Sequence, residues 1–250
     1  MIKFYYNCKS NINIHYKPNL NQKLKKKGVN YMGTYGITVE VSGDLALFTR
    51  PELKAERTSY EMITPSAARG LLESIYWKPA FRWVIDKIYL CNPIRFTNIR
   101  RNEVSAVALS STARSAMRGA RIPLYIDASA HIQQRASQVL RDVRYVIEAH
   151  FEMTDRAGER DNPDKHYAIA MRRLQKGQCF HQPYLGCREF PARVSLFEGK
   201  TVVTAYPDSE EDLGYMLWDI DYRDPQNIRP LFFHAVLKNG VLDLTGGVRG

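Results

Sequence analysis

The sequence predicts an α+β fold: a ferredoxin-like (RRM-like) N-terminal domain with an inserted basic hairpin or loop, followed by a small C-terminal antiparallel β-sheet domain. Two segments of helical periodicity each lie between alternating segments, which gives the order strand–helix–strand twice. After about residue 200 only alternating segments remain. Hydrophobic residues make up 44% of the 250 residues, enough for a core without disulfides or a metal. We therefore expect domains at 32–199 and 200–250.

The first predicted unit is strand, helix, strand. Residues 35–41 (YGITVEV) alternate as in a strand, 42–44 bend it, and 45–48 continue the apolar run before a polar loop at 50–59. Thr64 is a suitable N-cap and Pro65 a suitable first helical residue. The helix should end before Pro79, because the residue preceding a proline disfavours the helical conformation.

The second unit repeats this order. Alternating segments at 81–90, 94–99 and 141–153 predict three strands. A helix is expected over 162–176, closed by Gly177, and a turn at 185–189 leads into a strand that ends near 194. Beyond 200, strands are expected at 215–222, 230–237 and 241–244, the last two joined by the hairpin turn Lys238-Asn239-Gly240.

The N-terminal segment differs in composition from the rest of the chain. Residues 1–31 contain seven lysines and no acidic residue, and they account for seven of the ten net positive charges. The segment lacks an apolar run of signal-peptide length. We expect a disordered or non-native leader, with Met32 as the natural start; a basic RNA-binding tail is the alternative.

A second basic segment lies within the body. Between residues 95 and 121 there are six arginines and one acidic residue, Glu103, and small residues fill 105–120. The planar guanidinium suits phosphate, so we expect a flexible loop or hairpin that binds nucleic acid, although a solvated loop would have the same composition. The candidate RNA-binding arginines are Arg95, Arg100, Arg101, Arg114, Arg118, Arg121 and Arg135.

The cysteines at 8, 91, 179 and 187 form no C-x-x-C pair, which disfavours a zinc site. We expect free thiols, a cytoplasmic location, and no metal or other cofactor.

Tyr76, Lys165 and His166 are the candidate catalytic residues. RNA cleavage without a metal needs one group to orient or deprotonate a 2′-hydroxyl, a cation beside the crowded phosphate, and an acid for the departing 5′-oxygen. Lys165 and His166 follow the run DNPD (161–164) at the start of the second helix, and Tyr76 is 90 residues away in SIYWKP. Buried Tyr and His are more often satisfied core residues, so the pattern alone leaves that interpretation open.

The geometry of a helix limits how these residues could act. Adjacent helical side chains point about 100° apart, so Lys165 and His166 converge more easily from the N-terminal cap, where unpaired N–H groups also favour phosphate. The catalytic assignment requires His166 to reach a groove.

Long strings in the chain resemble the type I-C CRISPR-associated Cas5d family, of the repeat-associated RNA-binding superfamily. They are SIYWKP (74–79), RRNEV (100–104), QQRASQVLRDV (133–143), EAHFEMT (148–154), DKHYAIAMRRLQKGQCFHQPYLGCREFPA (164–192) and VLKNGVL (236–242). The resemblance covers about 35–245. It implies a metal-independent endoribonuclease that cuts precursor CRISPR RNA within the repeat, and it assigns catalysis to Tyr76, Lys165 and His166. The turn with Gly186 and Arg188 matches the family's RNA-contacting loop.

The resemblance also implies a reaction and partners. The RNA's 2′-hydroxyl would attack the adjacent phosphate, leaving a 2′,3′-cyclic phosphate. His166 would act as the acid, Lys165 would stabilise the phosphorane, and Tyr76 would orient the 2′-hydroxyl. The protein would stay on the 5′ handle and join the backbone, large and small subunits of the interference complex, with target DNA as a further partner. Two alternatives stay open: a non-catalytic subunit that caps the guide's 5′ handle, and a nonspecific DNA-binding subunit.

Overall fold

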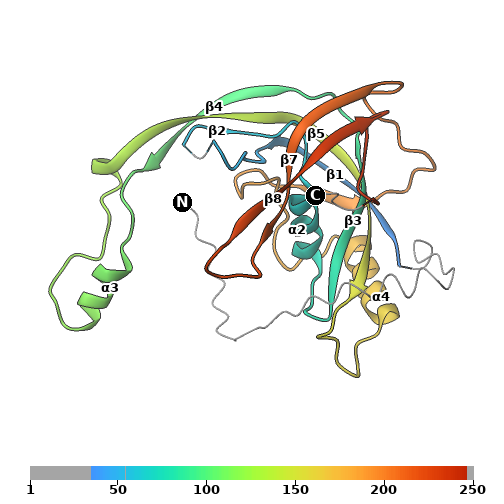
Figure 1. The fold of residues 1–250 in the computed structure, drawn as a ribbon. Helices are drawn as coiled ribbons and strands as arrows, with labels where there is room; N and C mark the ends of the chain where they lie inside the picture. The colour runs from blue at the N-terminus through green and yellow to red at the C-terminus, as the bar shows by residue number, and fades with distance from the viewer. Residues whose placement is uncertain (1–34, 54, 247–250) are drawn as a thin grey trace.

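The computed structural model describes residues 35–53 and 55–246, so the predictions for residues 1–31 and Met32 lie outside the described part. Its centre is a nine-stranded sheet in the order β6-β1-β5-β3-β9-β8-β7, with β2 and β4 also paired to β5 (Figure 1). The elements are β1 (Ile37–Ala46), β2 (Arg57–Thr58), α2 (Pro65–Ile75), β3 (Phe81–Leu90), β4 (Phe96–Val104), α3 (Ser110–Met117), η2 (Ser129–His131), β5 (Ile132–Met153), α4 (Pro163–Gln175), β6 (Arg193–Leu196), β7 (Glu210–Asp221), β8 (Arg229–Lys238) and β9 (Val241–Asp243). The predicted combination of helices and strands is confirmed, and the strands form one large, mostly antiparallel sheet.

The core forms where α2 and α4 pack on one face of the sheet. Along β5, Tyr145, Ile147 and Ala149 are almost fully buried at alternate positions, because successive side chains of a strand point to opposite faces. Leu72 of α2 and Ala170 of α4 belong to the same buried cluster. The alternating pattern in the sequence therefore marks the face that the helices cover.

The helix α2 begins at the predicted cap Thr64, and α4 begins at the predicted residue 162, which proves to be its cap. Thr64 accepts a hydrogen bond from the Ala67 backbone N–H (3.3 Å), and Asn162 accepts one from the Lys165 N–H (2.8 Å). A proline follows each cap, as expected where the first N–H has no helical partner. The helix α2 ends at Tyr76, which is extended with φ −154° and ψ 124°.

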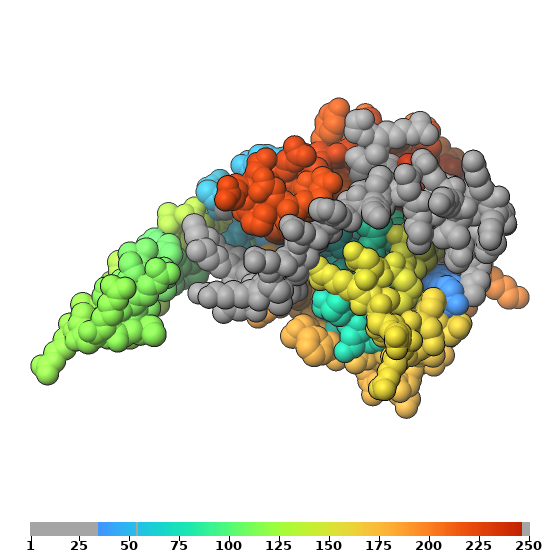
Figure 2. Space-filling view, turned by 60° about the horizontal axis from the view of Figure 1, so that its bottom comes forward, coloured from blue at the N-terminus to red at the C-terminus, as the bar shows by residue number. Residues whose placement is uncertain are grey.

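The basic segment forms an arm that projects from the body (Figures 1 and 2). The expected loop or hairpin is a hairpin, in which β4 pairs antiparallel with the first half of β5 and the connecting segment contains the helix α3. The predicted start of the strand at 141 was wrong, because β5 begins at Ile132. The strand β4 also runs to Val104 rather than to 99. None of the residues 91–136 is buried. Because so little of this segment is covered, only residues 94–99 alternate in the sequence, and the rest of these strands carries no apolar pattern to detect.

The C-terminal strands continue the same sheet. The strand β9 pairs with β3 through Lys87↔Asp243, and β8 pairs with β9. The predicted hairpin turn is present, with positive φ at Asn239 (53°) and Gly240 (74°). The division into domains at residue 200 stays a prediction. No helix in the described part of the chain is long and apolar enough to cross a membrane.

Candidate active site

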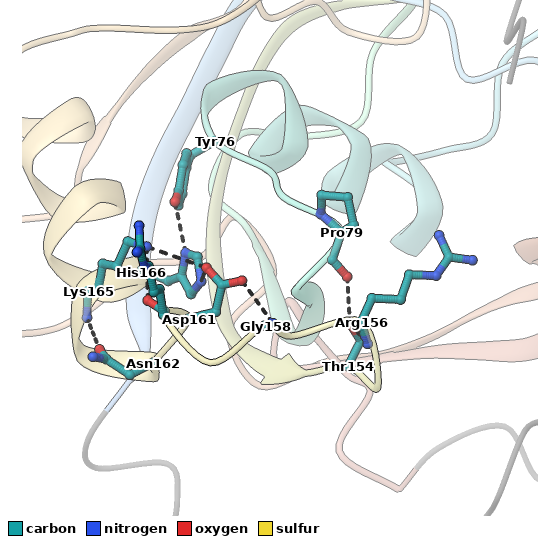
Figure 3. A network of polar contacts seen from close by, with 10 residues as sticks. Tyr76, Pro79, Thr154, Arg156, Gly158, Asp161, Asn162, Lys165 and His166 are labelled. Atoms are coloured by element: carbon teal, nitrogen blue, oxygen red, sulfur yellow. Dashed lines mark hydrogen bonds and ion pairs between the residues drawn. The ribbon is translucent and has the colours of Figure 1, made fainter.

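Tyr76 and His166 are hydrogen-bonded in the structure, although 90 residues separate them in the chain. The Tyr76 hydroxyl lies 2.8 Å from Nδ1 of His166 (Figure 3), and the ring's tautomer decides which atom donates. Tyr76 lies directly after α2, and His166 lies in the first turn of α4. The contact therefore depends on the packing of the end of one helix against the start of the other.

The imidazole of His166 is enclosed. His166 is 1% exposed, and its ring centroid is 5.0 Å from that of Phe81 and 6.0 Å from that of Tyr76. Burial lowers the pKa of His166 below its ordinary value, while the negative charge of Asp161 acts in the opposite direction. Burial likewise raises the pKa of Tyr76, and Arg173 opposes that shift. A raised pKa disfavours a role for Tyr76 as a base and favours a positioning role.

The carboxylate of Asp161 lies beside both Lys165 and His166. Its Oδ1 is 3.3 Å from Nε2 of His166 and 3.4 Å from Nζ of Lys165. The contact with Nε2 lacks the alignment of a hydrogen bond, and Nε2 has no such partner among the described residues. The other oxygen, Oδ2, accepts a hydrogen bond from the Gly158 N–H (3.1 Å), which is the main cause of the lowered pKa of Asp161. Lys165 and His166 thus converge on one carboxylate from the cap of α4, as the helix geometry indicated.

Arg173 connects the two helices behind the site. Its Nη1 donates to the Ile75 carbonyl (2.6 Å), and its guanidinium lies 5.1 Å from the centroid of the Tyr76 ring. A cation at the C-terminal carbonyls of α2 offsets the negative end of the helix dipole. Arg173, which could have faced a ligand or solvent, instead holds Tyr76 in place.

The structure does not meet one requirement of the catalytic assignment, which is the access of His166 to a groove. His166 was expected to reach a groove, but it is buried. Two cavities among the described residues, of about 110 and 630 Å³, are lined by residues other than Tyr76, Lys165 and His166.

The predicted RNA-binding arginines fall into two groups. At the base of the arm, Arg101 bonds to Glu189 and to Ser137 (3.1 Å), Arg135 lies 3.6 Å from Glu103, and Arg95 lies 3.9 Å from Asp142. No salt bridge within the described residues involves the remaining arginines of the set. These are Arg100, Arg114, Arg118, Arg121 and Arg188, all exposed. The second group is available to a polyanion without breaking an ion pair.

Gly186 has a structural reason to be glycine. Its φ is +81°, and a Cβ built there would lie 2.0 Å from the carbonyl oxygen of Leu47. Beside it the Leu47 N–H donates to the Leu185 carbonyl (3.1 Å). The turn is pressed against the end of β1, so a glycine is needed whether or not RNA contacts it.

Sequence reasoning did not assign Asp161 a role. A signal was available, because Asp161 and Lys165 have the i, i+4 spacing of a helical ion pair. No spacing in the sequence indicated the contact between Asp161 and His166. No group of three or more His, Cys, Asp or Glu side chains suited to a metal occurs among residues 35–53 and 55–246.

The fold is similar to that of a CRISPR-associated protein. A solved structure described as a CRISPR-associated protein superposes with a TM-score of 0.62 at 27% identity, covering 86% of this chain and 95% of that one. The SMU1763c protein of Streptococcus mutans, described as functionally uncharacterized, shares the fold, with a TM-score of 0.59, 24% identity, and 86% and 95% coverage.

The chain belongs to the Cas5d family. The family model described as CRISPR-associated protein (Cas_Cas5) matches residues 36–245. A relative from Mannheimia succiniciproducens, named CRISPR pre-crRNA endoribonuclease Cas5d, is 50% identical over 213 residues, covering 83% of this chain and 94% of the relative. A relative of the same name from Thermus thermophilus is 39% identical over 227 residues, covering 83% and 90%. The resemblance seen in the sequence is confirmed.

Proposed function

We propose that this protein is an endoribonuclease that cuts precursor CRISPR RNA within the repeat and stays on the 5′ handle. Relatives that are 50% and 39% identical carry the name of that activity. The observation that carries the proposal is the convergence of Lys165 and His166 on one carboxylate oxygen, with Tyr76 bonded to the far side of the imidazole. The position of that oxygen is one where an anion can contact both the ammonium of Lys165 and the imidazole of His166.

The reaction that fits these groups needs no external nucleophile. The 2′-hydroxyl gives up its proton to solvent water as it attacks the adjacent phosphorus, the bond to the 5′-oxygen breaks, and the products are a 2′,3′-cyclic phosphate and a 5′-hydroxyl. Nε2 of His166 delivers the proton to the departing oxygen, and Lys165 offsets the charge on the phosphorane. The hydrogen bond of Tyr76 to Nδ1 supports a role in holding the imidazole rather than in orienting the 2′-hydroxyl. No metal takes part in this scheme.

The topology supports a ferredoxin-like arrangement for the catalytic domain. The strands β6-β1-β5-β3 are neighbours, α2 connects β1 to β3, and α4 connects β5 to β6. In this proposal the exposed arginines of the arm contact the repeat RNA, and binding fixes which phosphate reaches the site. As a subunit of the type I-C interference complex the protein would meet the backbone, large and small subunits.

The test is cleavage of the cognate repeat RNA in EDTA. We expect the wild type to make one cut, and His166→Ala to lose about 100-fold or more in rate, the usual contribution of a general acid, while RNA binding persists. The matched control is His234→Ala, which removes an exposed imidazole on β8 paired with Asp212. Loss of cleavage in both variants would contradict the assignment of His166.

The burial of His166 favours a second candidate, a subunit that caps the guide's 5′ handle without cutting. In that case the wild type would bind the repeat RNA and leave it intact under every condition tested. The same gel therefore separates the two candidates.

A further inference from the structure

Asp161 lies where an anion would have to lie for Lys165 and His166 to act on it. Its Oδ1 is 3.3 Å from the imidazole Nε2 and 3.4 Å from the Lys165 Nζ. Nε2 is fully buried yet lacks a hydrogen-bond partner among the described residues. A buried ring nitrogen left in this way costs free energy unless another group pairs with it.

We propose that the Asp161 carboxylate occupies the position of the scissile phosphate, and that RNA binding displaces it to open the site. This inference rests on the proposed function. A phosphodiester carries one negative charge, as the carboxylate does. The exchange therefore keeps the charge balance at Lys165 and His166, and it replaces a poorly aligned contact with one that can be aligned.

The segment that carries Asp161 is anchored at its start and closed by its own hydrogen bonds. The Thr154 N–H donates to the Ala80 carbonyl (2.8 Å), and its hydroxyl donates to the Pro79 carbonyl (2.5 Å), which anchors the start. Residues 158–161 form a turn closed by the bonds Asp161 N–H to Gly158 O (2.9 Å) and Gly158 N–H to Asp161 Oδ2 (3.1 Å).

The contacts that hold this turn to α4 are those of Asp161 with His166 and those of Lys165, whose Nζ donates to the Arg160 carbonyl (3.1 Å) and lies 3.4 Å from Asp161 Oδ1. Residues 158–160 are exposed, and the turn lies at the surface, in the yellow region of Figure 2. Figure 3 shows Asp161 reaching back from it onto the imidazole. Few buried contacts are lost when such a segment swings away, so local opening is inexpensive compared with unfolding.

The charged and titratable groups around His166 make the exchange measurable. Asp161 raises the pKa of His166, while Lys165 and Lys78 lower it; Tyr76 bonds Nδ1, and β3 contributes only the uncharged ring of Phe81. Removing the Asp161 charge therefore lowers the pKa of His166 further in the free protein. A phosphate in the same place would raise it again.

The experiment compares the full chain with Asp161→Asn and with Asp155→Asn, a control that removes an exposed carboxylate from the same segment. The probe is the repeat RNA with a 2′-deoxy nucleotide at the scissile position, which cannot be cut. We expect Asp161→Asn to bind it about two- to fivefold more tightly than the control, the range for removing one partly exposed ion pair. Equal affinity of the two variants would overturn the inference.

The second readout is the pKa of His166 from ¹⁵N-histidine NMR, measured with and without this RNA. Without RNA the pKa of Asp161→Asn should lie below that of the wild type; with RNA the two values should converge, since a phosphate faces the imidazole in both. A difference that persists in the complex would show that Asp161 stays beside His166, and would overturn the inference. Convergence in proteins that do not cleave normal RNA would support the displacement and contradict only the catalytic assignment.

Discussion

The two halves of β5 differ, because one lies in the core of the sheet and the other lies in the arm. From Val143 to Phe151 the strand lies between β1 and β3, and its alternate residues are buried. From Ile132 to Leu140 it is paired with β4, and from 132 to 136 none of its residues is buried. Asp142 separates the halves with a φ of +54°. One strand is thus specified by burial in one half and by cross-strand pairing in the other.

The pairing half has its own stabilising contacts at the base of the arm. Glu103 lies 3.1 Å from Arg57 and 3.6 Å from Arg135. Partly exposed pairs of this kind contribute little individually, and a shared carboxylate makes them a network. We therefore expect mutations in the body to lower the free energy of unfolding, and mutations in the arm to change the binding of ligands.

The largest expected difference comes from two glycines with positive φ. Gly186→Ala places a Cβ 2.0 Å from the Leu47 oxygen in the body, whereas at Gly119 in the arm, with φ +94°, a Cβ meets nothing within 4 Å. We expect Gly186→Ala to lower the free energy of unfolding by about 3 kcal/mol or more, and Gly119→Ala by about 1 kcal/mol or less. Urea denaturation followed by tryptophan fluorescence measures both. Similar losses at the two positions would contradict the contrast.

The next effect concerns the buried hydroxyl of Tyr76. Tyr76→Phe leaves Nδ1 of His166 without its bond, so we expect a loss of about 1–3 kcal/mol in the free energy of unfolding. Tyr125→Phe in the arm is the control, because Tyr125 is 78% exposed, and it should leave stability within about 0.5 kcal/mol. A loss of cleavage in Tyr76→Phe without any loss of stability would instead favour direct contact of the hydroxyl with RNA.

The sequence predicted those features that depend only on neighbouring residues, such as the starts of the helices. The two helices begin at Thr64 and Asn162, where the sequence predicted their starts. An N-cap depends on a hydrogen bond between residues only three positions apart, so a short stretch of sequence is enough to predict it. The sequence could not predict that His166 is buried with Asp161 beside its Nε2, since that contact depends on how the segment after β5 folds back. The first half of β5 was missed because no core imposes alternation on it. Recognising the candidate residues was therefore easier than predicting their accessibility.

A smaller effect distinguishes two histidines of the body. A hydrogen bond to Asp86 (2.8 Å) raises the pKa of His150, while burial lowers that of His166. His150 should therefore contribute stability that is present below its unfolded pKa of about 6.5 and is lost as the pH rises through its folded value. His166 should behave oppositely: its contribution is lost as the pH falls below about 6.5 toward its folded pKa. ¹⁵N-histidine NMR should show the two titrating on opposite sides of about 6.5, and a shared midpoint would contradict the assigned causes.

The smallest effect on stability is expected in the arm, where the effect on binding is specific. The combined change Arg114→Gln, Arg118→Gln and Arg121→Gln removes three exposed charges, so the free energy of unfolding should stay within about 0.5 kcal/mol. If each arginine contacts a phosphate, the slope of log affinity for repeat RNA against log salt should become shallower by about 2.

The control removes the same charge from the body through Arg193→Gln, Arg223→Gln and Arg229→Gln, whose partners are Asp44 and Asp221. An equal change of slope in both variants would mean that RNA responds only to net charge. A change confined to the arm would mean that its two strands, in which no residue from 91 to 136 is buried, are kept extended to reach the RNA.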